Sequence, residues 1–168
     1  SAGQHYGDYR DTLCGQPFLI SVASLTAQKN HAQMLDVFAS LLPRLDEGRA
    51  LKLVLLGDGP LRGKLQDQCR QLSLKLFDAE RDRIFDDDAQ VHFLGFQRNP
   101  YRLLSKAQLM LLTSHWEGLP IALLEAMALG VPSVVSNCSE GIREVWNLTG
   151  KSADSATLNQ AITTPYGI

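Results

Sequence analysis

Two glutamates, Glu117 and Glu125, are separated by seven residues across a stretch that has the pattern of a loop followed by a helix. Pro120 suits the first position of that helix, because its missing N–H would have no helical partner there. Apolar residues then recur at helical spacing, and Gly130 with Pro132 ends the helix. We therefore expect Glu117 in the loop before the helix and Glu125 more than one turn inside it.

This placement suits a ligand that has a negatively charged centre and hydroxyl groups on both sides. The free N–H groups at the start of the helix attract an anion such as a pyrophosphate. A carboxylate on either side can accept hydrogen bonds from hydroxyls, so a nucleotide sugar, with its sugar, two phosphates and ribose, has the matching layout. The alternative is a solvated helix face with a favourable N-terminal charge. Glu125, however, stands among apolar residues and needs a partner or a ligand.

Length and composition set broad limits. The 168 residues are enough for one domain with a single core, and the net charge of −2 creates no global field that favours nucleic acid or an anionic membrane. No apolar run approaches the ~20 residues that span a bilayer, and no signal-peptide pattern opens the chain. Cys14, Cys69 and Cys138 are odd in number and widely spaced, which argues against a disulfide framework or a zinc site and predicts a cytoplasmic location.

Strand and helix signals alternate along the chain. Residues 1–16 are polar and are interpreted as a tail or linker from a preceding domain, and residues 17–168 as one nucleotide-sugar-binding unit. The expected strands are residues 18–25, 51–56, 91–94, 109–113 and 133–136, and the expected helices are residues 30–45, 61–74, 101–106, 120–129, 142–146 and 156–162. Strands that are apolar on both faces and alternate with helices predict an α/β, Rossmann-like, doubly wound parallel sheet with helices on both faces. Ligands bind such sheets beyond the carboxyl ends of the strands.

The loops after the expected strands carry the other candidate groups. Gly57 and Gly59 directly follow a strand, which fits either a tight turn or the close approach of a ligand. Lys29 follows the first strand, where its ammonium group could reach a phosphate or could simply be solvated. Residues 86–88 form an Asp-x-Asp pattern, but in a charged, turn-like segment that favours an exposed loop over a manganese site.

Five segments appear in an order that resembles a known family: residues 22–30, 55–60, 91–95, 113–120 and 124–132. Together they resemble the C-terminal, donor-binding half of a retaining GT-B glycosyltransferase of family 4, over roughly residues 18–145. The resemblance implies transfer of a hexosyl unit from a nucleoside diphosphate sugar, with UDP favoured, to an acceptor hydroxyl with retained configuration. Residues 137–144 resemble members that build surface polysaccharides and other glycans.

The resemblance also implies a role for each matching residue. Lys29 would neutralise the diphosphate, Glu117 would bind hydroxyls of the transferred sugar as charge develops at its anomeric carbon, and Glu125 would bind the ribose. The remaining donor-binding positions are Gly118, Leu119, Pro120 and Ile121 against sugar and phosphate, Phe96 and Gln97 against the base edge, and Ser24, Gly57 and Gly59. No metal or other cofactor is expected, because the lysine and the helix dipole neutralise the diphosphate.

The chain departs from the family at one position and in its extent. Ser24 stands where the family usually has an arginine that grips the diphosphate, and Arg143 is the candidate to replace it. A charge-assisted hydrogen bond is worth roughly 1.5–3 kcal/mol, so donor binding should weaken by about one to two orders of magnitude. The N-terminal domain that holds most of the acceptor site has no counterpart here. We therefore expect a fragment that binds donor but transfers little alone, with any membrane association made through that domain.

Two other functions stay open at this point. A nucleotide-sugar 2-epimerase would use the same scaffold and ligand without an acceptor, although the Glu-Gly-Leu-Pro and Leu-Glu-Ala-Met runs favour the transferase. A non-catalytic flavodoxin-like or receiver-like module is the other alternative. A receiver needs a cluster of acids at the strand ends, where this chain has Ser24, Gly57, Gly95 and Ser114.

Overall fold

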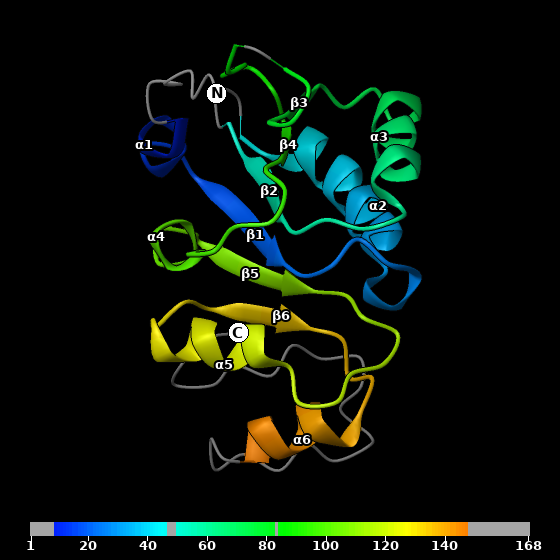
Figure 1. The fold of residues 1–168 in the computed structure, drawn as a ribbon, viewed down its shortest axis with the longest axis vertical. Coiled ribbons are helices and arrows are strands. Elements are labelled where there is room, and N and C mark those ends of the chain that lie inside the picture. The colour runs from blue at the N-terminus through cyan, green and yellow to red at the C-terminus, as the bar shows by residue number, and fades with distance from the viewer. Residues whose placement is uncertain (1–8, 47–49, 83, 148–168) are drawn as a thin grey trace.

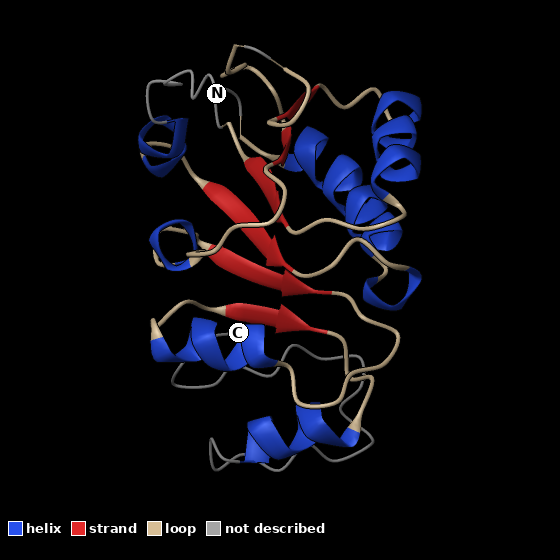
Figure 2. Cartoon of the chain, in the orientation of Figure 1, coloured by secondary structure: helices blue, strands red, loops and turns tan. Residues whose placement is uncertain are grey.

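Six strands form a single sheet in the computed structural model, which describes residues 9–46, 50–82 and 84–147. The strands are β1 (Phe18–Val22), β2 (Lys52–Leu56), β3 (Leu76–Asp78), β4 (Val91–Phe93), β5 (Leu109–Leu112) and β6 (Ser133–Val135). They lie in the order β3-β4-β2-β1-β5-β6, and every pair of neighbours is parallel. All carboxyl ends therefore lie at one edge of the sheet, which Figure 2 shows as the ends of the arrows.

Helices cover both faces of this sheet, as Figure 1 shows. They are α1 (Tyr9–Cys14), α2 (His31–Leu41), α3 (Arg62–Gln71), α4 (Tyr101–Leu104), α5 (Ile121–Ala128) and α6 (Glu140–Asn147), with short 3-10 turns at Ala27–Lys29 (η1) and Leu42–Arg44 (η2). The α2 and α3 helices pack on one face, and α1, α4 and α5 pack on the other. This arrangement confirms the predicted α/β, Rossmann-like fold class.

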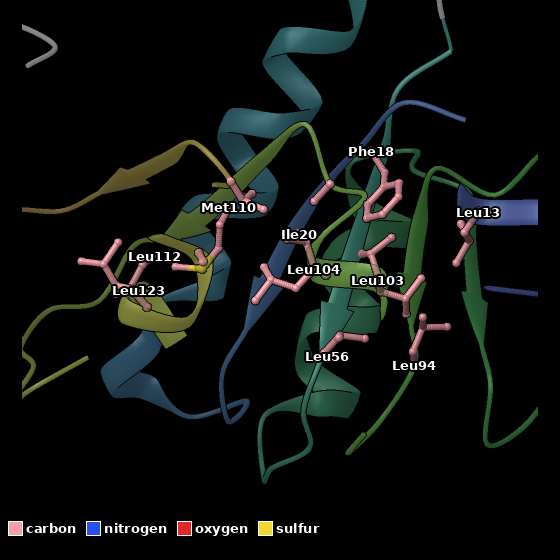
Figure 3. Close-up of a cluster of buried hydrophobic side chains, with 14 of the residues drawn as sticks. Leu13, Phe18, Ile20, Leu56, Leu94, Leu103, Leu104, Met110, Leu112 and Leu123 are labelled. Atoms are coloured by element: carbon pink, nitrogen blue, oxygen red, sulfur yellow. The ribbon is translucent and has the colours of Figure 1, made fainter. Parts of the chain in front are cut away.

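The hydrophobic core is divided into two layers by the sheet itself. Successive residues of a strand point to opposite faces, so Phe18 and Ile20 of β1 pack toward α4 and α5, as Figure 3 shows. Leu19 of the same strand packs toward Met34 and Phe38 of α2. Because both faces are covered, the central strands β1, β2 and β5 are mostly apolar on both faces, which is the pattern that predicts a parallel sheet.

Some element boundaries differ from the sequence prediction. The first strand ends at Val22, because the chain then turns and the Leu25 N–H donates to the Asp58 carbonyl at 3.0 Å. The second helix ends at Leu41 and continues only as the 3-10 turn, since Pro43 has no N–H to donate. Pro120 is extended and precedes the first residue of α5, so its expected place as first helical residue is wrong by one position.

The β3 strand was not predicted. Its three residues form the edge of the sheet, between Lys75 and a charged segment, and offer no apolar run long enough to be recognised. Short strands at a sheet edge, paired on one side only, are commonly marked by flanking charges. The backbone pairing with β4 defines this strand.

The two ends of the chain were predicted as a linker and a last helix. Residues 1–8 and the expected helix at 156–162 lie outside the described residues. Residues 9–14, expected to be part of the linker, form the helix α1, and Leu13 is fully buried in the core beside α4. The domain boundary at residue 17 stays a prediction. In the described part of the chain, no helix has the length and apolar character needed to cross a membrane.

Candidate donor-binding site

The loops at the carboxyl edge of the sheet converge where the strand order reverses. The β1 strand lies between β2 and β5, so the loops after β1 and β5 depart on opposite sides of the sheet. Open parallel sheets bind ligands in the crevice at such a point. The loop after β1 carries Lys29, and the loop after β5 carries Glu117.

Lys29 and Glu117 meet across this crevice although 88 residues separate them. The Lys29 Nζ donates to both carboxylate oxygens of Glu117, at 2.6 Å and 2.8 Å, and the Ser114 Oγ donates to Oε1 at 2.5 Å. The Glu117 side chain is only 5% exposed. A buried carboxylate is costly without partners, and here a cation and a hydroxyl supply them.

Further hydrogen bonds hold the same two loops together. The His115 N–H donates to the Gln28 carbonyl at 2.8 Å, and the Gln28 Nε2 donates to the Trp116 carbonyl at 2.9 Å. The Thr113 Oγ1 lies 3.1 Å from the Lys29 carbonyl and shares its hydrogen between this carbonyl and the next one along the chain. The two charged groups therefore stand on a backbone framework that is already in place.

A second group of predicted residues lines an open pocket of about 320 Å³ beside this crevice. Its wall is mostly apolar and consists of Val22, Ala23, Ser24, Leu56, Gly57, Asp58, Phe96, Gln97 and Pro100. Phe96 is 76% exposed, and the Gln97 Nε2 donates to the Leu94 carbonyl at 2.7 Å. The pocket thus brings together Ser24, Gly57, Phe96 and Gln97 from three different loops.

The glycines of the loop after β2 are required by contacts between loops. Gly57 has φ +140°, and a Cβ there would lie 2.1 Å from the Ala23 carbonyl oxygen. A Cβ on Gly59 would lie 2.6 Å from the Leu25 carbonyl oxygen. These distances support the tight-turn interpretation of both glycines, and Gly57 in addition lines the pocket.

An ion network centred on the buried side chains of Arg62 and Asp78 contacts the loop after β2. Arg62 of α3 contacts Asp78 at the end of β3 and donates to Glu80 at 2.9 Å, and Gln66 donates to Asp78 at 2.6 Å. Burial alone would raise the pKa of Asp78, but the hydrogen bonds from Arg62, the Glu80 N–H and Gln66 outweigh it and lower that pKa. Arg62 also lies 3.4 Å from Asp58, which ties the network to the pocket wall.

The N-terminal end of α5 faces the crevice with an exposed loop. Gly118 and Leu119 are exposed, Ile121 is 62% exposed, and no side chain caps the helix at Pro120. The free N–H groups of this first turn suit an anion. Glu125 is half-buried one turn further on, and its Oε1 accepts a hydrogen bond from the Tyr101 Oη at 2.9 Å.

Ser114, Tyr101 and Gly141 contact this site but were not predicted as site residues. A Cβ on Gly141 of α6 would lie 2.1 Å from the Gly118 carbonyl oxygen, so α6 can approach the Glu117–Gly118 loop only with glycine here. Tyr101 reaches Glu125 from α4, 24 residues earlier in the chain. Neither contact has a sequence signal, since each depends on how two separate elements pack.

The Asp-x-Asp segment, residues 86–88, lies at the amino ends of the strands, opposite the carboxyl edge. Asp86 and Asp88 pair with Lys75, and Asp87 pairs with Lys52, the first residue of β2. Across residues 9–46, 50–82 and 84–147, no three His, Cys, Asp or Glu side chains are grouped to hold a metal ion. Arg143, the candidate replacement for the missing arginine, bonds Asn137 at 3.3 Å and Glu140 at 3.1 Å.

Known proteins are similar to this chain in both sequence and fold. A family model described as "Glycosyl transferases group 1" matches residues 16–164. An uncharacterized glycosyltransferase of Methanocaldococcus jannaschii is 30% identical over 137 residues, which are 82% of this chain and 30% of the relative. The N-acetylgalactosamine-N,N'-diacetylbacillosaminyl-diphospho-undecaprenol 4-alpha-N-acetylgalactosaminyltransferase of Campylobacter jejuni is 31% identical, over 81% of this chain and 32% of the relative.

Solved structures agree on the fold. The Anabaena protein HepE, crystallised with UDP and glucose, superposes with a TM-score of 0.63 at 20% identity, over 82% of this chain and 34% of that one. The chain therefore spans about a third of the length of the relatives that it matches. With the matched family model covering most of its length, this chain belongs to the glycosyl transferases group 1 family.

Proposed function

We propose that this chain is the donor-binding part of a glycosyltransferase that moves a hexosyl unit from a nucleoside diphosphate sugar to an acceptor hydroxyl. The observation that carries the proposal is the Lys29–Glu117 pair, which bridges the crevice beside the uncapped N-terminus of α5. A cation, an anion-binding helix end and a carboxylate are the groups that a charged diphosphate and a sugar require.

Binding would exchange partners at this pair. The diphosphate takes the place of the Glu117 carboxylate at the Lys29 ammonium and accepts hydrogen bonds from the first N–H groups of α5. Glu117, with Ser114 still donating to it, then accepts hydrogen bonds from hydroxyls of the sugar. Positive groups fixed at the leaving diphosphate stabilise the charge that develops there as the glycosidic bond breaks. Since lysine and the helix end neutralise that charge, the proposed reaction needs no metal ion.

The rest of the nucleotide would extend along the carboxyl edge. Glu125 accepts hydrogen bonds from the ribose, and the base enters the pocket lined by Ser24, Phe96 and Gln97. Two named relatives support the substrate class: one is an N-acetylgalactosaminyltransferase and one was crystallised with UDP and glucose. We propose a UDP-sugar donor and retained configuration, in the synthesis of a surface glycan at the cytoplasmic face of a membrane. The acceptor and any membrane contact would belong to an N-terminal domain of the longer protein.

Ligand-observed NMR tests the proposal, with UDP, GDP, ADP and their glucose and N-acetylhexosamine conjugates, at low salt and with EDTA present. We expect one base to be preferred and Glu125→Ala to weaken binding of the nucleoside diphosphate. Glu117→Ala should spare the nucleoside diphosphate but remove the discrimination between sugars. Asp88→Ala, which changes an exposed carboxylate at the opposite edge, is the matched control. Binding by both glutamate variants that equals the wild type would contradict the assignment of the site.

A further inference from the structure

A hydrogen bond between side chains joins the α4 and α5 helices. The Tyr101 Oη donates to the Glu125 Oε1 at 2.9 Å. Tyr101 is the first residue of α4 and is 46% exposed, whereas Glu125 lies in the middle of α5 and is half-buried. The tyrosine therefore reaches out of the core to the carboxylate, and it does not itself fill the apolar layer beneath.

The same tyrosine is joined directly to the wall of the pocket. Pro100, the residue before it, lines the pocket together with Phe96 and Gln97 of the preceding loop. Leu103 and Leu104, two and three residues further on, are buried in the core and anchor α4. The phenol oxygen thus has a fixed place relative to the pocket, and its hydrogen bond fixes the Glu125 carboxylate relative to that same wall.

Resting on the proposed function, we propose that Tyr101 is a positioning residue that holds the Glu125 carboxylate in the orientation that recognises the ribose hydroxyls of the nucleotide. A carboxylate has two oxygens and about four lone-pair positions, and accepts hydrogen bonds at several of them together. Tyr101 occupies one position on Oε1. The remaining positions serve a neighbouring pair of hydroxyls such as the 2′ and 3′ hydroxyls of a ribose.

Pre-orientation explains why such a contact would matter. Ordering a long side chain on binding costs affinity, and a side chain that is already held avoids much of that cost. The phenol keeps its proton and stays a donor at neutral pH, because the pKa of a tyrosine is ordinarily about 10 and the hydrogen bond to Glu125 raises that of Tyr101. The expected gain is about 3- to 10-fold in affinity for a ribonucleotide.

The test compares UDP with 2′,3′-dideoxy-UDP, which keeps the base and the diphosphate but lacks both hydroxyls. We expect Tyr101→Phe to weaken UDP binding about 3- to 10-fold and to leave dideoxy-UDP binding unchanged. In a Glu125→Ala background, the same change should have no further effect on either ligand. An equal loss for both ligands, or no loss for UDP, would overturn the inference, because Tyr101 would then pack against the base or play no part.

Two further measurements separate this inference from the proposed function. Lys29→Ala should weaken the binding of UDP and of dideoxy-UDP by the same factor, because the proposed function places its ammonium group at the diphosphate. If Lys29→Ala weakens binding in this way and Tyr101→Phe has no effect, the inference about Tyr101 is overturned and the proposed function is not. Failure of the wild type to bind any of UDP, GDP and ADP overturns both, and if another base is preferred, the same comparison is made with that nucleotide and its 2′,3′-dideoxy form. NMR titration of the Tyr101 ring needs no nucleotide: the pKa of Tyr101 should fall in Glu125→Gln. An unchanged titration would mean that the hydrogen bond does not form in solution.

Discussion

Both edges of the sheet carry pairs of lysine and carboxylate side chains, but the two sets are built differently. At the carboxyl edge, Lys29 and Glu117 come from loops 88 residues apart, and the Glu117 side chain is 5% exposed. At the amino edge, Lys75 pairs with Asp86 at 3.1 Å and with Asp88 at 3.7 Å, and the Asp88 side chain is 90% exposed. The Lys29–Glu117 pair is enclosed between two loops, whereas the pairs of Lys75 lie in solvent within a single region of the chain.

The difference shows that position in the fold decides which acids are enclosed and which face solvent. An Asp-x-Asp pattern has metal-ligand character in the sequence, yet here it is paired with lysines on the far side of the sheet from the crevice. The glutamate pair has a weaker pattern, but its Glu117 lies where loops from neighbouring strands converge. Enclosure matters because electrostatic interactions are stronger where water is excluded.

The largest expected effect comes from breaking the enclosed pair. Lys29→Ala leaves the buried Glu117 carboxylate without its cation, and removing one partner of a buried pair costs about 3 kcal/mol of unfolding free energy. Urea denaturation measures this loss. The double variant Lys29→Ala Glu117→Ala should recover part of it, since no unpaired charge then remains.

Lys75→Ala is the matched control at the amino edge. Its side chain is solvent-exposed and its ion pairs are screened by water, so the denaturation midpoint should stay where it is. Equal losses in Lys29→Ala and Lys75→Ala would remove the distinction between the two edges.

A smaller effect is expected from adding one methyl group where the loops of the carboxyl edge interlock. Gly141→Ala places a Cβ 2.1 Å from the Gly118 carbonyl oxygen, and a backbone atom cannot give way cheaply. We expect a loss of about 2 kcal/mol of unfolding free energy, together with weaker discrimination between sugars, because the loop that carries Glu117 must move.

Gly63→Ala is the control for this substitution. A Cβ at Gly63 in α3 meets nothing within 4 Å, so alanine should stabilise the helix by about 0.5–1 kcal/mol. Thermal or urea unfolding of the two variants gives the comparison. A neutral Gly141→Ala would mean that the loop and α6 are not held as tightly as the close approach indicates.

The smallest effect concerns the two buried histidines, one near each edge. Burial lowers the pKa of His31, beside Ser21, and of His92, beside the Ala89 carbonyl, from 6.5 to about 4. Between those values the unfolded chain binds more protons than the folded one, so stability is present above pH 6.5 and is lost as pH falls toward 4.

Each histidine should remove about 1 kcal/mol of unfolding free energy between pH 7 and pH 5.5. Urea denaturation at a series of pH values measures the slope. His31→Gln and His92→Gln should each make that slope shallower. A slope that no histidine variant alters would assign the pH dependence to carboxylates.

Much of the fold was accessible from local patterns. The apolar runs at 18–22, 52–56 and 109–112 identify buried strands, because both of their faces meet helices. The three-residue strand β3 was not predicted, because it is the outermost strand of the sheet and contains no long apolar run. The helix at 9–14 was missed for a similar reason: Leu13 is buried in the core and the adjacent Cys14 packs against it, and two neighbouring residues make no periodic pattern.

For the site, sequence indicated the groups and the edge but not their partners. The roles of Lys29, Glu117 and Glu125 remain predictions, although the structure places the first two in contact. That Tyr101 would reach Glu125 could not be predicted, because it depends on the packing of α4 against α5. The need for glycine at position 141 could not be predicted either, because it comes from the carbonyl oxygen of Gly118, which is 23 residues earlier in the chain.

By itself, the sequence determined the order of strands and helices, the parallel sheet and the family, because apolar periodicity and glycine-proline turns are local properties of the chain. Only the tertiary structure decided which charges are enclosed: it paired Lys29 with Glu117, joined Tyr101 to Glu125 and left residues 86–88 at the opposite edge. The physical reason is that desolvation and hydrogen bonding act through space, between atoms that the chain order keeps far apart.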